Sequence, residues 1–280
     1  MSKSPNTDQI AYWNSEAGTR WAVLQERLDA QFADLTDAAL DHAGPRAGDR
    51  VLDVGCGCGA TVLALAGRVG PRGTVVGVDV SRPMLDVAAQ RVRAGQLPGV
   101  TLLLADASTH PFEPGAFDLA FSRFGVMFFD DPVQAFANIR RPLAGGGRLS
   151  FACWRRMSEN PFFLVPFVAA KPYLPPQPPA DPEAPGPFAF ADEDRVGRIL
   201  NAAGFSAIEV VRHDPMIRLG GAAAAADLAT QMGPVARLLA EAEAGVKAAA
   251  QAAILEEFTR HEGPDGILLP GSVWLVSARA

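Results

Sequence analysis

Three aspartates, each at or near the end of an apolar segment, are the residues best placed to bind a ligand. Asp53 precedes a glycine-rich turn, Asp79 closes the segment 74–79, and Asp106 follows the segment 100–104. Carboxylates accept hydrogen bonds from hydroxyl and amino groups. An acid at position 79 could accept from both hydroxyls of a ribose, and Asp106 could accept from an adenine amino group. The spacing predicts a nucleoside site.

The glycine-rich turn lies between apolar residues 51–54 and a helical pattern that begins at Thr61. Its three glycines, Gly55, Gly57 and Gly59, alternate with other residues. Glycine adopts positive φ and lacks a Cβ, so a ligand can approach the backbone closely. The free amides of the first helical turn then face that ligand. Such a turn is typical of nucleotide-type sites.

Two other ligands compete for this turn. A triphosphate loop requires a lysine after its last glycine, and none follows Gly59. The dinucleotide pattern is satisfied by Gly55, Gly57 and Ala60. However, Asp53 would repel a pyrophosphate and attract an ammonium or sulfonium group. A nicotinamide-dependent oxidoreductase stays open as an alternative, as does a non-catalytic binding or regulatory protein of the same fold.

Taken in order, these motifs resemble those of class I S-adenosylmethionine-dependent methyltransferases. The resemblance continues through residues 117–122 and 142–149 and covers about residues 48–154. Within that family the chain is most similar to the small-molecule branch that contains ubiquinone and menaquinone biosynthesis methyltransferases. The resemblance implies S-adenosylmethionine as cofactor and S-adenosylhomocysteine as product, with no metal. It implies direct displacement of the methyl group toward a small, partly apolar acceptor that is positioned and desolvated.

The same resemblance assigns a set of cofactor-binding residues. The glycines would lie under the methionine portion, Asp53 would orient the amino-acid end, and the carbonyl of Ser122 would face the ammonium. The full set is Asp53, Gly55, Cys56, Gly57, Gly59, Asp79, Val80, Met84, Asp106, Ala107 and Ser122.

No catalytic residue is assigned, and the candidates are His110, Arg123 and His213. Arg123 follows the segment 117–122, where it would either bind an anionic acceptor or close a salt bridge. Ser122 stands where a magnesium-dependent branch would carry an acid. Aromatic and apolar residues that could face the acceptor are Tyr12, Trp13, Trp21, Phe124, Met127, Phe162, Phe163 and Phe188.

The elements that position these residues alternate between strands and helices. Strands are expected at 51–54, 74–79, 100–104, 117–122, 147–153, 208–211 and 273–278, with helices at 60–68, 83–94, 132–141 and 194–203. This alternation predicts a doubly wound, Rossmann-like α/β fold with ligands at the carboxyl ends of the strands. The resemblance implies seven strands, mostly parallel, with a reversed last strand.

Four segments organise the chain. Residues 1–47 are predicted to form an N-terminal helical lid, residues 48–154 the cofactor-binding core, and residues 155–191 a second lid rich in proline and aromatic residues. Proline density there argues against regular helix or strand across the middle. Residues 192–280 would complete the core, with an alanine-rich helical insertion at about 218–262.

The composition of the chain limits which classes of substrate, membrane contact and metal site are expected. The net charge of −6 and the absence of a Lys/Arg run argue against a nucleic-acid substrate. No apolar run approaches the ~18 residues of a membrane span, and residues 1–9 lack a signal-peptide core, which favours a cytoplasmic protein. Cys56 and Cys58 are too few for a metal site without further ligand pairs, so small turn residues are expected there. The choice between monomer and homodimer stays open.

Overall fold

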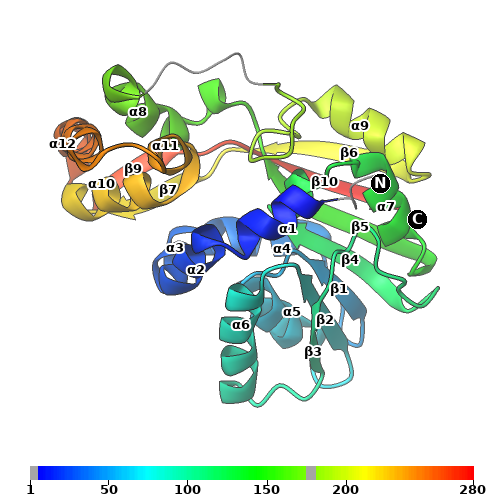
Figure 1. Ribbon diagram of the computed structural model, residues 1–280. Coiled ribbons are helices and arrows are strands. Elements are labelled where there is room, and N and C mark those ends of the chain that lie inside the picture. The colour runs from blue at the N-terminus through cyan, green and yellow to red at the C-terminus, as the bar shows by residue number, and fades with distance from the viewer. Residues whose placement is uncertain (1–5, 175–180) are drawn as a thin grey trace.

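A seven-stranded sheet forms the centre of the computed structural model, which describes residues 6–174 and 181–280 (Figure 1). The strand order is β3-β2-β1-β4-β5-β10-β6. The strands are β1 (Arg50–Val54), β2 (Thr74–Asp79), β3 (Val100–Leu104), β4 (Phe117–Arg123), β5 (Leu143–Trp154), β6 (Ser206–His213) and β10 (Val273–Arg279). β10 pairs antiparallel with β5 and β6, and the other pairs are parallel. The predicted fold, with its reversed last strand, is confirmed.

The central strands are buried along most of their length. In β1 the residues from Val51 to Val54 are all buried, and β4 is buried at four consecutive residues from Leu119. Such continuous burial is typical of a parallel sheet covered on both faces. The helices of this core are α4 (Ala33–Ala43), α5 (Ala60–Val69), α6 (Arg82–Ala94), α7 (Pro132–Arg140) and α9 (Glu193–Ala202).

The N-terminal region is helical, as its apolar spacing predicts. α1 (Thr7–Trp13), α2 (Glu16–Val23) and α3 (Gln25–Gln31) precede α4. Figure 1 shows these three helices running between α6 below and a group of later helices above. Arg20 of α2 and Arg27 of α3 donate to the carbonyl oxygens of Gln231 and Ala224 in that group, at 3.3 and 2.7 Å.

The later group lies between β6 and β10 in the sequence. Its helices are α10 (Ala222–Gln231), α11 (Gly233–Leu239) and α12 (Ala244–His261), which are separated near Gly233 and Gly245. A small antiparallel sheet that the sequence pattern did not predict joins them, with β7 (Met216–Gly220), β9 (Gly266–Pro270) and β8 (Glu262–Gly263) in that order. Its strands have five residues or fewer, and the residues of β7 alternate between exposed and buried.

The prediction for residues 155–191 was wrong in part, because a regular helix forms there. α8 (Pro161–Ala170) lies between the short 3₁₀ segments Met157–Glu159 and Lys171–Tyr173. Pro161 occupies the first turn, where a missing N–H costs nothing. Pro166 lies inside the helix and removes one hydrogen bond. Packing of α8 against α11 and α12 compensates for that loss. The predicted lid prolines at 175–180, like the first five residues of the predicted N-terminal lid, lie outside the described residues.

Candidate functional site

One cavity of about 240 Å³ lies at the carboxyl ends of the strands, bordered by α1, α3, α8 and the α10–α12 group. Among the predicted residues, the cavity is lined by Gly55, Cys56, Gly57, Asp79, Val80, Met84, Asp106, Ala107, Arg123, Trp13, Trp21, Phe124, Met127, Phe162 and Phe163. Seven others are not part of its lining: Asp53, Gly59, Ser122, His110, His213, Tyr12 and Phe188.

The glycine turn between β1 and α5 requires its glycines for different reasons. Gly55, Gly57 and Gly59 have φ of 71°, 53° and 85°, a region that L side chains rarely adopt. A Cβ on Gly55 would stand 2.6 Å from the Cα of Gly125, so this glycine lets the loop after β4 approach β1. A Cβ on Gly57 would meet only the sulfur of Met84 at 3.8 Å, on the cavity side. Gly57 therefore keeps a bare backbone facing the cavity.

Asp79 connects the end of β2 to this turn. Its Oδ2 accepts from the Gly57 amide and its Oδ1 from the Ser81 amide, both at 2.8 Å. Burial raises the pKa of this carboxyl, and the amide hydrogen bonds oppose the rise. Each carboxylate oxygen keeps a second lone pair. Asp79 can therefore accept two further hydrogen bonds from a ligand in the cavity.

Asp53 lies beneath the turn and is fully buried. Its Oδ2 accepts from the Thr61 hydroxyl at 2.5 Å, while its Oδ1 has no hydrogen-bond partner in the described part of the chain. Burial raises its pKa to about 7, and the Thr61 hydrogen bond and the charge of Arg123 limit that rise. A buried carboxylate oxygen without a donor is costly, and a ligand cation above the turn would relieve the cost.

The carboxylate of Asp106 accepts hydrogen bonds from a residue that the sequence analysis did not identify as part of the site. The side-chain amide of Asn6, just before α1, donates to both Asp106 oxygens and to the Ser108 hydroxyl, each at 3.0 Å. Asn6 also exchanges two hydrogen bonds of 2.7 Å with Asp130. An asparagine in a polar N-terminal stretch carries no signal for such a contact. Its effect is to hold the start of α1 against the end of β3.

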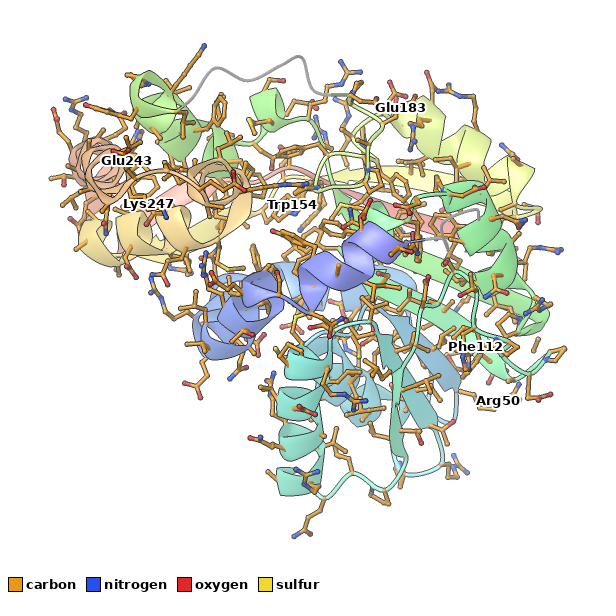
Figure 2. All side chains as sticks on the ribbon, in the orientation of Figure 1. Arg50, Phe112, Trp154, Glu183, Glu243 and Lys247 are labelled. Carbon is orange, nitrogen blue, oxygen red and sulfur yellow. The ribbon has the colours of Figure 1, made fainter. Side chains whose placement is uncertain are left out.

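Aromatic rings form the wall of the cavity at the carboxyl ends of β4 and β5. Phe124 stacks on Trp154, with ring centroids 4.3 Å apart and planes at 9°. Phe162 of α8 stacks on the same indole at 5.8 Å, and Phe32 contacts Phe124 edge-on at 5.9 Å. Phe124 holds a positive φ of 68°, a strained conformation for a bulky residue. Figure 2 shows Trp154 where the α10–α12 group faces α1.

Sequence reasoning missed Phe32 and Trp154, although a tryptophan that ends a predicted strand was a usable signal for the second. It also missed the lining residues from the α10–α12 group. These are Ala225, Leu228, Ala229, Met232, Gly233, Pro234, Val235 and Phe258. They belong to helices whose docking depends on tertiary packing, so no local pattern identified them.

Arg123 lies among these rings at the end of β4. Its guanidinium is 5.9 Å above the ring of Phe32, and its Nη1 donates to the Thr36 hydroxyl at 2.5 Å. Its Nε is buried without a partner, and the arginine forms no ion pair with any described residue. Burial lowers its pKa, opposed chiefly by the charge of Asp29. Of the two roles expected from the sequence, the salt bridge is absent from the described residues.

The predicted residues outside the lining have other contacts. Ser122 donates to the Val54 carbonyl at 2.7 Å and joins β4 to β1. Tyr12 packs beneath the guanidinium of Arg237 at 5.5 Å, which joins α1 to α11, and Phe188 packs on Phe163. Gly59 precedes α5 against Ala88.

Neither candidate histidine lies at the cavity. His110 packs edge-on against Phe112, with ring centroids at 4.6 Å. His213 ends β6, and the next residue, Asp214, forms an ion pair with Arg155 at 2.7 Å.

The titratable groups along the described part of the cavity include no histidine. Within the described chain they are Asp29, Asp79, Asp106, Arg123 and the thiols of Cys56 and Cys58. Burial raises the pKa of both thiols, so they stay protonated. All three cysteines are free, and no group of three or more potential metal ligands occurs among the described residues. Nor does this part of the chain contain a helix long and apolar enough to span a bilayer.

Residues 52–151, which run from β1 through most of β5, match the family described as methyltransferase domain. A relative from Streptomyces sp. (strain C5), aklanonic acid methyltransferase DauC, is 33% identical over 153 residues, covering 54% of this chain and 65% of its own. Demethylmenaquinone methyltransferase of Bacillus cereus (strain AH187) is 40% identical over 102 residues, covering 36% of this chain and 43% of its own. The match thus spans less than two thirds of either relative.

Solved structures share the fold over more of the chain. The YcgJ protein from Bacillus subtilis aligns with a TM-score of 0.57 at 18% identity, covering 87% of this chain and 97% of that one. At this identity the likeness concerns the fold alone. It extends beyond the residues of the family match.

Proposed function

We propose that the protein transfers a methyl group from S-adenosylmethionine to a small, partly apolar acceptor, because residues 52–151 match the methyltransferase domain family. One observation supports this most directly: a bare glycine turn, two strand-end acids and an aromatic wall border the same cavity. The two relatives are named for methylation of aklanonic acid and of demethylmenaquinone, both small molecules. A nicotinamide-dependent or purely regulatory role is not favoured by these comparisons.

The residues present fit the cofactor. The open face of Gly57 would lie under its methionine portion, and the unpartnered Oδ1 of Asp53 would complement its ammonium. Asp79 would accept from the ribose hydroxyls, while Asp106 and Ala107 would face the adenine beside Met84. When bound, S-adenosylmethionine supplies a methyl group already activated by a sulfonium, which leaves with the C–S electron pair as a neutral thioether.

The protein's own contribution is then placement and exclusion of water. Aromatic side chains from α3–α4, β4–β5 and α8 enclose the acceptor end of the cavity. A closed apolar site fixes the approach of two reactants and removes competing solvent. The described lining contains no histidine and its thiols stay protonated, so we expect the acceptor to be nucleophilic without a dedicated base.

Replacing Asp79 tests the cofactor assignment. The change Asp79→Ala removes the acceptor for ribose hydroxyls, and we expect S-adenosylhomocysteine to bind more weakly by about 1–3 kcal/mol, as for hydrogen bonds lost in a buried site. Isothermal titration calorimetry measures the difference. Asp118→Ala, which removes a carboxylate from the same sheet but outside the cavity lining, is the control. Equal affinity of Asp79→Ala and the unaltered protein would exclude the ribose role.

A further inference from the structure

We propose that Arg123 determines acceptor specificity, and that the acceptor is a flat apolar molecule bearing an ionised oxygen, as in a carboxylate, phenolate or enolate. The inference rests on the proposed function, since it names the class of acceptor for the same cavity. It rests on the guanidinium of Arg123, which lies in the aromatic wall and forms no ion pair with a described residue.

The guanidinium of Arg123 has hydrogen-bonding capacity that the described chain does not use. A guanidinium carries five N–H donors and no acceptor. Only the Nη1 bond to Thr36 is made, and the buried Nε has no partner. Buried donors in native structures are nearly always satisfied. An anionic oxygen in the cavity would supply the missing acceptor.

The neighbouring carboxylates do not neutralise this cation. Asp29 forms an ion pair with Arg91 at 2.8 Å, and Arg91 also donates to the Cys58 carbonyl at 2.9 Å. Asp53 lies beneath the turn on Thr61. Burial lowers the pKa of Arg123, yet a guanidinium stays protonated in proteins. Arg123 is therefore a charged group that Asp29 and Asp53 influence without forming an ion pair with it.

A second buried arginine shows what a structural role looks like in this fold. Arg155 also has a buried Nε without a partner. However, it forms ion pairs with Asp214 and Glu159, and it is not part of the cavity lining. Arg123 differs on both points, because it faces the cavity and has no carboxylate partner among the described residues.

The aromatic residues around Arg123 indicate the shape and polarity of the part of the acceptor that does not contact the guanidinium. Phe32 lies under the guanidinium and also contacts Trp154 and Phe162, at 5.9 and 6.0 Å. Stacked rings favour a flat apolar skeleton, and an ion pair is stronger where water is excluded. An acceptor that arrives ionised also needs no base, which agrees with the absence of histidine from the lining.

The carboxylate of the cofactor's methionine portion is the competing partner for this cation. Arg123 contacts Phe32 and Thr36, on the aromatic side of the cavity. The orphan Oδ1 of Asp53 lies beneath the glycine turn, where the charge of Arg123 still acts on it. The contacts of Arg123 with Phe32 and Thr36 favour the acceptor, and the experiment distinguishes the two partners.

Two probes of equal shape test the proposal: 2-naphthoate, which is anionic, and 2-naphthamide, which is neutral. Their affinities are measured by calorimetry with S-adenosylhomocysteine bound. The unaltered protein should prefer the naphthoate by about tenfold or more, the effect of a hydrogen bond to a charged group. Arg123→Met should abolish the preference, and Arg123→Lys should retain part of it. Arg50→Met removes an arginine at the amino end of β1, distant from Trp154 in Figure 2, and should leave the preference unchanged.

Several results would overturn the assignment. They are no measurable binding of naphthoate to the unaltered protein, equal binding of the two probes, or a preference that survives in Arg123→Met. Weaker S-adenosylhomocysteine binding by Arg123→Met with the probe preference intact would assign the cation to the cofactor instead. Should Arg123→Met fail to fold, Arg123→Gln replaces it. Failure of the unaltered protein to bind S-adenosylhomocysteine would refute the proposed function, whereas the probe preference, measured without it, would still judge Arg123.

Discussion

Single residues define this site through charges that the fold leaves partly uncompensated. Asp53 keeps one oxygen without a donor under the glycine turn, and Arg123 keeps its Nε without an acceptor beside the aromatic wall. Each carboxylate oxygen of Asp79 accepts one hydrogen bond from a backbone amide. A cation near Asp53 and an anion near Arg123 would each relieve a cost already present in the protein. Ligand binding should therefore couple to protonation.

Asp53 gives that coupling a direction. Its pKa of about 7 in the folded protein lies above the usual value, so the carboxyl is largely protonated below neutral pH. A bound ammonium would favour the ionised form, and S-adenosylhomocysteine binding should release a proton and strengthen as pH rises toward 7. Calorimetry at pH 6.5 in buffers of different ionisation enthalpy measures the release. Asp53→Asn should abolish it, and an unchanged proton release in this variant would contradict the assignment.

The same shift has a consequence for stability without ligand. The folded protein binds a proton at Asp53 more tightly than the unfolded chain does. The stabilisation is therefore complete below the usual pKa of an aspartate and is lost as pH rises through about 7. Thr61 and Arg123 favour the ionised carboxylate, whereas Asp79 opposes it.

The acids and glycines could be predicted because their signal is local. Asp53, Asp79 and the glycines occupy fixed positions relative to strand ends, so the pattern of types and spacing identifies them without tertiary knowledge. Asn6 and Phe32 could not be predicted in this way. Asn6 matters because α1 returns to the end of β3, and Phe32 because α3 and α4 place it under Arg123.

Among the elements, the N-terminal helices are the ones that cover the site, and we propose that they act as a lid. Gln9, Ile10 and Trp13 of α1 line the cavity. The helix is held at its start by Asn6 and at its end by Asn14, which donates to the Val80 carbonyl at 2.8 Å. Both contacts lie next to residues assigned to the cofactor. The position of α1 should therefore control how fast the cofactor leaves.

Loosening the first contact tests this role. Asn6→Ala removes the side-chain hydrogen bonds to Asp106 and Ser108 and the one accepted from the Asp130 amide. It should make local opening of α1 easier by about 1–3 kcal/mol. Hydrogen exchange of the α1 amides should accelerate, and S-adenosylhomocysteine should dissociate faster in stopped-flow measurements. Asn201→Ala, at an exposed position of α9, is the matched control. Unchanged exchange and dissociation in Asn6→Ala would show that α1 does not gate the site.

Helices and strands differed in how well the sequence predicted them. The apolar patterns of the core predicted the bounds of its helices and strands to within a few residues. The largest error was the start of β5, which begins at Leu143 and not at residue 147. α8 was missed because proline content argued against a helix, whereas packing on α11 and α12 outweighs one lost hydrogen bond. The β7–β9 sheet was missed because its strands are short and separated by three helices.

At the scale of the whole molecule, the sheet gathers residues that lie far apart in sequence into one cavity. The carboxyl ends of β1, β2, β3 and β4 border its cofactor side, and the α10–α12 group together with α8 closes the opposite side (Figure 1). The family match covers residues 52–151, so it includes the first side and little of the second. We infer that the cofactor side performs the shared chemistry and that the other side selects the acceptor.

A crystal structure of the protein with S-adenosylhomocysteine tests the central claim most directly. The account predicts the ribose on Asp79, the adenine beside Asp106 and Ala107, and the sulfur facing the compartment of Phe124, Trp154 and Arg123. A cofactor bound outside the cavity, or bound with its amino-acid end against the aromatic wall and Arg123, would contradict it.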